Sequence, residues 1–162
     1  MRTIKEIYKI GHGPSSSHTM GPSFAAEIFL KNIPDTRKAD ITLYGSLAAT
    51  GKGHLTDKAL TDIFHNAGVE VSIAWQPKTF LPFHPNAMKF EAYDAENNYI
   101  DSWTVYSVGG GSLKEENPKF LDNTNPDIYP HTRMKDIMEY CISKGLNYWE
   151  YVQRYEDADL WD

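Results

Sequence analysis

The sequence predicts an α+β domain with α/β layers, in which a mixed β-sheet is packed with helices. Segments with helical spacing of apolar residues alternate with strand-like segments over residues 22–75. Two further strand-like segments then flank a short polar turn at residues 95–98. Runs rich in glycine and proline separate these elements. Such an alternation followed by a hairpin is typical of a mixed sheet covered by helices.

The first predicted helix follows Pro22, because proline suits the first turn of a helix. Apolar residues recur there at helical spacing, and the segment 32–34 ends the helix. These residues are Phe24, Ala25, Ile28 and Phe29. Residues 41–44 alternate between apolar and polar side chains and therefore predict a short strand.

A second helix is predicted between Thr56 or Asp57 and Gly68. Its apolar residues follow the spacing i, i+3, i+4, i+7, and they are Leu60, Ile63, Phe64 and Ala67. Residues 69–75 alternate as a half-buried strand. The segments 88–94 and 99–106 predict a hairpin, and a triple glycine at 109–111 closes its second strand.

The region after this hairpin predicts a linker and two more helices. Residues 114–130 are polar and contain three prolines, so we interpret them as a linker and place a domain boundary near residue 128. Met134 and Met138 belong to a helical stripe interpreted as core, and Gly145 suits the end of that helix. Asn147 and Glu150 resemble a capping box. The acidic C-terminal residues are interpreted as a solvated face or a linker, and they are Glu156, Asp157, Asp159 and Asp162.

Composition narrows the possible functions. The chain has 162 residues, 41% of them hydrophobic, and a formal net charge of −6 without a basic block. Nucleic acid and anionic membrane are therefore not expected as partners. No apolar run reaches the roughly 20 residues that cross a bilayer, and the N-terminus does not resemble a signal peptide, so we expect a cytoplasmic location. The single cysteine, Cys141, excludes an internal disulfide and argues against a cysteine-held metal site within one chain.

The first glycine- and serine-rich segment, residues 11–22, is predicted to be a loop before a helix. It contains Ser15, Ser16, Ser17, His18 and Thr19. Free backbone N–H groups at a helix start, together with hydroxyls, form a cradle for a carboxylate or phosphate. An ordinary capped surface loop is the alternative, because serine is common in such loops.

The second such segment, residues 45–57, also connects a strand to a helix, where open α/β sheets often hold ligands. His54 titrates near neutral pH and is a candidate general base, while Lys52 is a candidate partner for an anion. The alternative is that His54 only helps to cap the following helix. His84 lies between prolines in a rigid turn, and the other histidines, His12, His65 and His131, are interpreted as ordinary.

Four segments taken together resemble the signatures of bacterial iron–sulfur L-serine dehydratases, in the order found in that family. They are residues 13–22 (GPSSSHTMGP), 45–57 (GSLAATGKGHLTD), 81–88 (LPFHPNAM) and 107–111 (SVGGG). The resemblance covers roughly residues 1–115, and residues 131–162 look like the opening of the family's catalytic α region. One departure is Ser112, where family members often have an aromatic residue after the triple glycine.

The resemblance implies that residues 1–128 are the β domain of an L-serine dehydratase and that residues 129–162 begin the α region. It implies β-elimination of L-serine to pyruvate and ammonia, with a [4Fe–4S] cluster held by cysteines of the missing α region and none bound by this segment alone. His54 would be the base, and the substrate-binding residues would be Ser15, Ser16, Ser17, His18 and Thr19, with Lys52 a weaker candidate. The catalytic α region and L-serine are the expected partners, and a homodimer is expected.

The same resemblance extends to the allosteric substrate-binding domain of some phosphoglycerate dehydrogenases. It therefore leaves a second hypothesis open, in which the chain is a regulatory module that binds an amino acid or anion. A third hypothesis is a structural subunit that drives dimerisation. Replacement of His54 separates the three, because only the catalytic hypothesis predicts a nearly inactive enzyme that still binds serine.

Overall fold

The computed structural model describes residues 3–7, 10–11, 13–121 and 127–156. Two compact units form, one of residues 10–121 and one that combines the N-terminal stretch 1–9 with residues 122–162. His12, Asp157, Asp159 and Asp162 lie outside the described residues, so the interpretations made for them stay predictions. Within the described part of the chain, no helix has the length and apolar character needed to cross a membrane.

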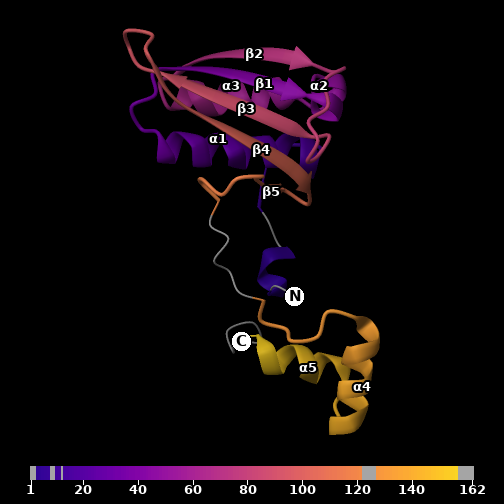
Figure 1. The fold of residues 1–162 in the computed structure, drawn as a ribbon. Helices are drawn as coiled ribbons and strands as arrows, with labels where there is room; N and C mark the ends of the chain where they lie inside the picture. The colour runs from indigo at the N-terminus through magenta and orange to yellow at the C-terminus, as the bar shows by residue number, and fades with distance from the viewer. Residues whose placement is uncertain (1–2, 8–9, 12, 122–126, 157–162) are drawn as a thin grey trace. The chain divides into compact units, whose positions relative to one another are not determined.

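The larger unit contains a five-stranded mixed sheet in the order β2-β1-β3-β4-β5 (Figure 1). The strands are β1 (Lys38–Tyr44), β2 (Glu70–Gln76), β3 (Ala87–Tyr93), β4 (Tyr99–Gly109) and β5 (Ser112–Lys114). β1 and β2 are parallel, while the β1–β3, β3–β4 and β4–β5 pairs are antiparallel. The helices α1 (Gly21–Asn32) and α3 (Thr56–Asn66) cover one face of the sheet. This confirms the predicted α+β architecture, including the hairpin.

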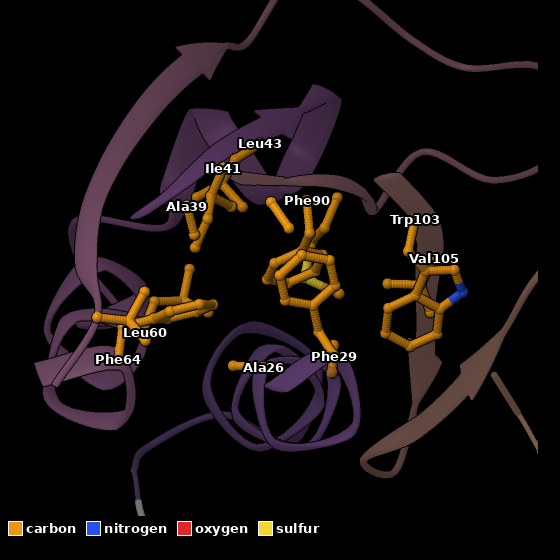
Figure 2. Close-up of a cluster of buried hydrophobic side chains, with 14 of the residues drawn as sticks. Ala26, Phe29, Ala39, Ile41, Leu43, Leu60, Phe64, Phe90, Trp103 and Val105 are labelled. Carbon is orange, nitrogen blue, oxygen red and sulfur yellow. The ribbon is translucent and has the colours of Figure 1, made fainter. Parts of the chain in front are cut away.

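The core lies between the sheet and these two helices (Figure 2). Phe29 of α1 and Phe90 of β3 have ring centroids 5.2 Å apart, and Phe64 of α3 lies 6.3 Å from each of them. All three side chains are fully buried. Burial of a phenylalanine stabilises a fold by roughly 1.5–3 kcal/mol, so these rings hold helices and sheet together. Strand β1 alternates between buried and half-buried residues because only one of its faces meets the helices.

The two segments predicted to be loops are partly helical, and this corrects the prediction. Ser16–Met20 forms a π-helical turn, η2, that runs directly into α1, and Gly45–Thr50 forms the short helix α2. The hydroxyl of Ser15 accepts a hydrogen bond from the N–H of His18 and so caps η2. Serine and glycine content predicted a loop, but a cap and the burial of Leu47 favour a helical turn instead.

The triple glycine does more than close strand β4, because it turns the chain into the fifth strand, which was not predicted. Gly109 pairs with Ser112, so Gly110 and Gly111 are the two central residues of a hairpin turn. Their φ angles are +58° and +70°. Two consecutive positive φ values are typical of a type I′ turn, which matches the twist of the paired strands. Glycine adopts these angles without a Cβ clash.

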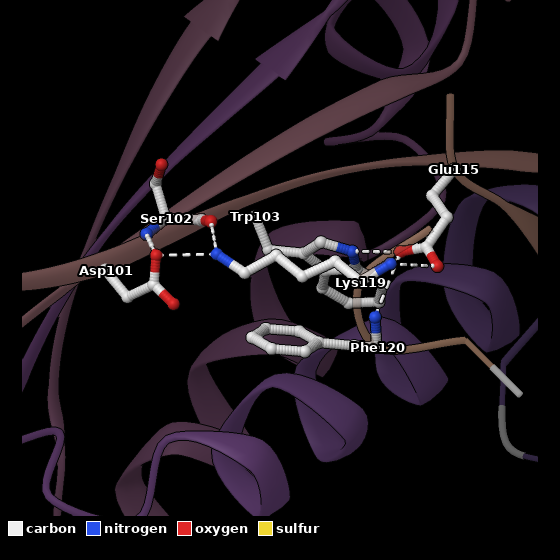
Figure 3. Close-up of polar contacts among 6 residues, drawn as sticks. All are labelled: Asp101, Ser102, Trp103, Glu115, Lys119 and Phe120. Atoms are coloured by element: carbon white, nitrogen blue, oxygen red, sulfur yellow. Dashed lines mark hydrogen bonds and ion pairs between the residues drawn. The ribbon is translucent and has the colours of Figure 1, made fainter. Parts of the chain in front are cut away.

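The first part of the predicted linker is folded onto the sheet through the carboxylate of Glu115 (Figure 3). The indole N–H of Trp103 donates to it at 2.7 Å, and the backbone N–H of Lys119 donates at 2.7 Å. The N–H groups of Phe120 and Leu121 donate to it at 3.2 and 3.1 Å. Residues 115–121 are therefore part of the larger unit rather than a free linker, as a composition-based prediction could not show.

The smaller unit contains α4 (Met134–Lys144) and α5 (Tyr148–Tyr155), and the short 3₁₀ helix η1 (Ile4–Ile7). The predicted end of α4 at Gly145 and the capping box of α5 are both confirmed. Met134 and Met138 are more than half exposed, so their interpretation as core is wrong. Ile137 and Cys141 of the same helix are buried instead, because they face α5 and Tyr129.

Glu156 is buried, which corrects its interpretation as a solvated residue. Its carboxylate accepts hydrogen bonds from the hydroxyls of Tyr129 and Thr3, each at 2.5 Å, and from the N–H of Ile4 at 2.8 Å. A buried carboxylate needs such partners, since an unpaired one would be costly. The sequence around Glu156 gives no sign of these partners, because Tyr129 lies 27 residues away and the N-terminal partners lie more than 150 residues away.

Candidate functional site

The four signature segments of the sequence converge in the larger unit, and the sheet topology explains why. β1 and β4 are both antiparallel to β3, so their carboxyl ends lie at the same edge, where β3 begins. At that edge the N–H of Ser46 donates to the carbonyl of Pro85 at 3.2 Å, and that of Ser107 donates to the carbonyl of Asn86 at 2.9 Å. The hydroxyl of Ser107 also donates to the carbonyl of Ser17 at 2.7 Å, which joins the first segment to the rest.

At the centre of this arrangement lie two histidines from different segments. The ring centroids of His18, in η2, and His54, before α3, are 4.9 Å apart. The hydroxyl of Thr19 donates to the carbonyl of His54 at 3.0 Å, and that of Thr56 donates to the carbonyl of His18 at 2.5 Å. His54 is therefore held against His18 rather than used as a helix cap, and α3 has no side-chain cap.

The imidazole of His18 is oriented by a neighbouring hydroxyl. Its Nδ1 lies 2.9 Å from the Oγ of Ser17, while its Nε2 is buried and meets the geometry of a hydrogen bond with no atom of the described residues. Burial, followed by the nearby His54 imidazole, lowers the pKa of His18, while the backbone of Ser46 acts in the opposite direction. The lowered pKa favours the neutral imidazole of His18 at pH 7.

The backbone between these histidine and threonine residues is strained. Leu55, which separates His54 from Thr56, has φ 59° and ψ 32°, in the left-handed region that a leucine rarely adopts. Its side chain is 50% exposed, so burial of the leucine is not what holds the backbone there. Residues in such conformations cost about 1–3 kcal/mol and cluster at functional sites, where surrounding contacts fix them.

The structure joins most, but not all, of the predicted site residues. Ser15, Ser17, His18 and Thr19 are linked to each other or to His54 through the contacts above and a 3.5 Å approach of the Ser15 and Ser17 hydroxyls. Ser16 is exposed. Lys52 makes a different contact, with its Nζ 5.6 Å from the ring centroid of Trp75.

Two residues of the site had no role in the sequence-based prediction. Ser107 bridges β4 to η2, and Asn86 donates from its Nδ2 to the carbonyl of Ser107 at 3.3 Å. The Oδ1 of Asn86 is buried and has no hydrogen-bond partner among the described residues. An unpaired buried acceptor of this kind is unusual and is able to receive a donor from a bound molecule. Both residues lie in the third and fourth signature segments, which was the available signal.

An apolar cleft of about 390 Å³ lies beside the histidine pair, between α1 and α3. Thr19, Leu55 and Phe24 contribute to its walls. Its lysine, Lys58, is paired with Asp62 at 2.8 Å, so the described residues that line the cleft offer no unpaired cation for a carboxylate. Among the described residues, no three His, Cys, Asp or Glu side chains gather as they would to hold a metal ion.

Comparison with known proteins gives a consistent result. The family model described as Serine dehydratase beta chain matches residues 3–70 and 62–118. An L-serine dehydratase of Helicobacter pylori is 32% identical over 198 aligned positions, which cover 96% of this chain and 43% of that protein. An L-serine dehydratase of Haemophilus influenzae is 29% identical, with 90% of this chain and 41% of that protein covered.

L-serine dehydratase TdcG of Escherichia coli is 32% identical, with 88% of this chain and 40% of that protein covered. The chain thus spans about two fifths of the length of the curated relatives that it matches. The alignment to the Helicobacter pylori protein is longer than the chain itself, so that relative contains additional residues within the matched region. Since the family model covers most of the chain, from residue 3 to residue 118, the chain belongs to the serine dehydratase beta chain family.

Proposed function

We propose that this chain supplies the β portion of an L-serine dehydratase, which converts L-serine to pyruvate and ammonia together with a catalytic α region. The observation that carries the proposal is the contact between His54 and His18, surrounded by the hydroxyls of the first signature segment. A purely structural loop has no need of two imidazoles with ring centroids 4.9 Å apart, one of which has a buried Nε2 without a hydrogen-bond partner among the described residues. Membership of the family and the names of its longer relatives support the same reaction.

In the proposed reaction His54 is the general base. It removes the proton from Cα of serine, and the electron pair left behind forms the Cα–Cβ double bond as the Cβ–O bond breaks. The hydroxyl leaves as hydroxide, which together with the proton taken up by His54 makes one molecule of water. The resulting aminoacrylate tautomerises to an imine, which water hydrolyses to pyruvate and ammonia. Because the Cα proton is weakly acidic, the base must act on a substrate held in a fixed position.

The remaining residues of the site would hold that substrate. Ser15 and Ser17 offer hydroxyls beside a helical turn, and a carboxylate accepts hydrogen bonds from such groups. Ser16 is exposed, and the hydroxyl of Thr19 already donates to the carbonyl of His54, so Thr19 would shape the site rather than bind the carboxylate. Neutral His18 would line the same site without adding a positive charge, which would repel the proton that His54 takes up. Lys52 would contribute a cation only after leaving the ring of Trp75.

The iron–sulfur cluster implied by the family does not fit the donors of this chain. A [4Fe–4S] cluster is held by about four cysteine thiolates, whereas the chain has one cysteine, Cys141, and it is buried in α4. We therefore propose that the α region binds the cluster. When bound, the cluster would act as a Lewis acid toward the leaving hydroxyl.

An exposed apolar stripe on α4 supports a partner for the smaller unit. Met134, Met138 and Ile142 are spaced four residues apart, and they are 58%, 56% and 77% exposed. Such a stripe usually packs against another element, which here would be further helices of the α region. We accordingly propose that residues 129–162 begin that region, after a β domain of residues 1–128. A homodimer, a cytoplasmic location and a fold shared with the allosteric substrate-binding domain of phosphoglycerate dehydrogenases are also proposed.

The test is anaerobic pyruvate release from L-serine by this chain combined with its catalytic region. His54→Ala is expected to lower kcat by about a thousandfold, because removal of a general base typically costs 10²–10⁴ in rate. The mutant should still bind serine and assemble normally. His65→Ala is a matched control, since His65 is exposed on α3 and is expected to leave the rate unchanged.

A rate of His54→Ala within a few-fold of wild type would remove His54 from catalysis. If the mutation instead changed only affinity or inhibition, the regulatory hypothesis would replace the catalytic one. If no residue of the loops affected the rate at constant assembly, a structural role in dimerisation would remain.

A further inference from the structure

Two threonines make reciprocal hydrogen bonds across the histidine pair. Thr19 follows His18 in the sequence and donates to the carbonyl of His54 at 3.0 Å. Thr56 lies two residues after His54 and donates to the carbonyl of His18 at 2.5 Å. The side chains of both threonines are shielded from solvent, with only 4% and 0% of each residue exposed.

The geometry points to Thr56 and Thr19 as positioning residues that form a brace, which holds His54 against His18. This inference rests on the proposed function, because it assigns the residues that place its general base. It goes beyond the residues predicted from the sequence, in which Thr56 was only a possible helix start and Thr19 a candidate for substrate binding.

Two opposed bonds restrain the two segments more than one bond would. A single hydrogen bond leaves the segments free to rotate about it, whereas two bonds at neighbouring residues fix both separation and rotation. The pair is needed because neither histidine belongs to the buried hydrophobic core: His18 lies in η2, and His54 lies in the turn before α3. Residue 55 connects His54 to Thr56 in a left-handed conformation, so the bond made by Thr56 also keeps a strained backbone in place.

The brace acts against electrostatics. The imidazole of His54 lowers the pKa of His18, which means that the two rings repel each other when protonated. Hydrogen bonds between neutral hydroxyls and carbonyls do not depend on this charge. They therefore keep the rings in contact in either protonation state of His54.

The experiment replaces Thr56 by valine, which has the same shape without the hydroxyl, and by serine, which keeps it. Nuclear magnetic resonance of the 162-residue chain would record contacts between the protons of the two imidazole rings and the pKa of His18. In Thr56→Val the ring contacts should disappear and the pKa of His18 should rise toward its ordinary value. Thr56→Ser should retain both properties of the wild type, and Thr19→Val should resemble Thr56→Val.

The same variants would then be assayed in the assembled dehydratase. Thr56→Val is expected to lower kcat by about tenfold to a hundredfold with little change in KM, because displacement of a catalytic group by about 1 Å has effects of this size. Thr56→Ser should restore most of the rate. Thr36→Val is the matched control: Thr36 is 1% exposed and donates to the carbonyl of Ile33 at 2.7 Å, away from the histidines. It should change neither the ring contacts nor kcat.

Ring contacts that survive in a folded Thr19→Val, Thr56→Val double variant would overturn the brace. An unchanged rate of Thr56→Val, in an enzyme that His54→Ala inactivates, would overturn the positioning role while leaving the base in place. Equal losses in Thr56→Val and the Thr36→Val control would also overturn it, since they would reflect general destabilisation. If His54→Ala itself kept the wild-type rate, the proposed function would fail, and the resonance data would still decide the brace.

Discussion

Replacement of Glu115 by glutamine is expected to destabilise the unit of residues 10–121 by about 2–4 kcal/mol. One carboxylate oxygen accepts from the indole of Trp103 at 2.7 Å and from the N–H of Phe120 at 3.2 Å. The other accepts from the N–H groups of Lys119 and Leu121, at 2.7 and 3.1 Å. Glutamine keeps one oxygen, so two of the four donors would face an amide NH₂. Each donor left without a partner costs about 1–3 kcal/mol, and partial exposure of the site favours the lower end.

The assay is urea denaturation at pH 7, followed by far-ultraviolet circular dichroism. Glu116→Gln is the matched control, because it removes the same charge from the next, exposed residue. A change in unfolding free energy below about 0.5 kcal/mol for Glu115→Gln, equal to that of the control, would refute the reasoning. Such a result would mean that the segment 115–121 contributes little to the stability of the sheet.

The pH dependence of the same variant tests the charge separately. Burial raises the pKa of Glu115, but the four donated hydrogen bonds outweigh burial and lower the pKa below its ordinary value. A carboxylate with a lowered pKa contributes stability that is present above its unfolded pKa and is lost as the pH falls through its folded pKa. Wild type should therefore lose its advantage over Glu115→Gln at acidic pH. An advantage that stayed constant down to the acid transition would contradict this account.

Two further predictions concern the site. A Cβ at Gly21 would lie 2.4 Å from the Oγ of Ser107, so Gly21→Ala should lower the unfolding free energy by about 1–3 kcal/mol. The control Gly53→Ala, whose Cβ would have no contact closer than 3.4 Å, should cost less than half of that. Equal urea midpoints for the two variants would disprove the prediction. The pKa of His18 is lower in the folded chain than in the unfolded chain, so between these two pKa values His18 is protonated mainly in the unfolded chain. Stability should therefore fall as the pH drops from about 6.5 toward the folded pKa. Denaturation midpoints across this range, compared with those of His18→Gln, measure the effect, and identical profiles would contradict it.

Elements with a strong periodic pattern could be predicted from the sequence. α3 shows its apolar residues at helical spacing and ends where Gly68 adopts a positive φ, and β2 alternates along its whole length. Both patterns arise from burial of one face, which the sequence records directly. The capping box of α5 is similarly local, because its two partners are three residues apart.

Features that depend on distant partners could not be predicted. The hydroxyl of Ser107 joins β4 to η2 by donating to the carbonyl of Ser17, 90 residues away, and nothing local in either segment records this contact. Glu115 was interpreted as part of a polar linker because its partners include an indole twelve residues away. Met134 and Met138 were predicted to be core but are exposed. Helical spacing identifies an apolar stripe on a helix but does not tell whether that stripe faces the core.

The candidate site shows the same division. His54 and the hydroxyl run could be identified from residue types and from the family resemblance, but their geometry could not, because the carbonyl–threonine contacts join residues 35 and 38 positions apart. Ser107 and Asn86 had no predicted role, since a serine at a strand end and an asparagine after a proline have ordinary structural uses.

The position of the histidine pair explains why directional hydrogen bonds, rather than core packing, should determine its geometry. His18, in η2, and His54, in the turn before α3, are both partly exposed, and neither belongs to the buried hydrophobic core. The strands bring the segments to one edge of the sheet with a tolerance set by side-chain packing. Proton transfer needs a narrower tolerance, with heavy atoms about 2.6–3.2 Å apart. Hydroxyl–carbonyl bonds of 2.5 and 3.0 Å between the same two segments fix the positions of the rings within that narrower range. Loss of one hydroxyl should therefore lower the reaction rate more than the stability of the fold.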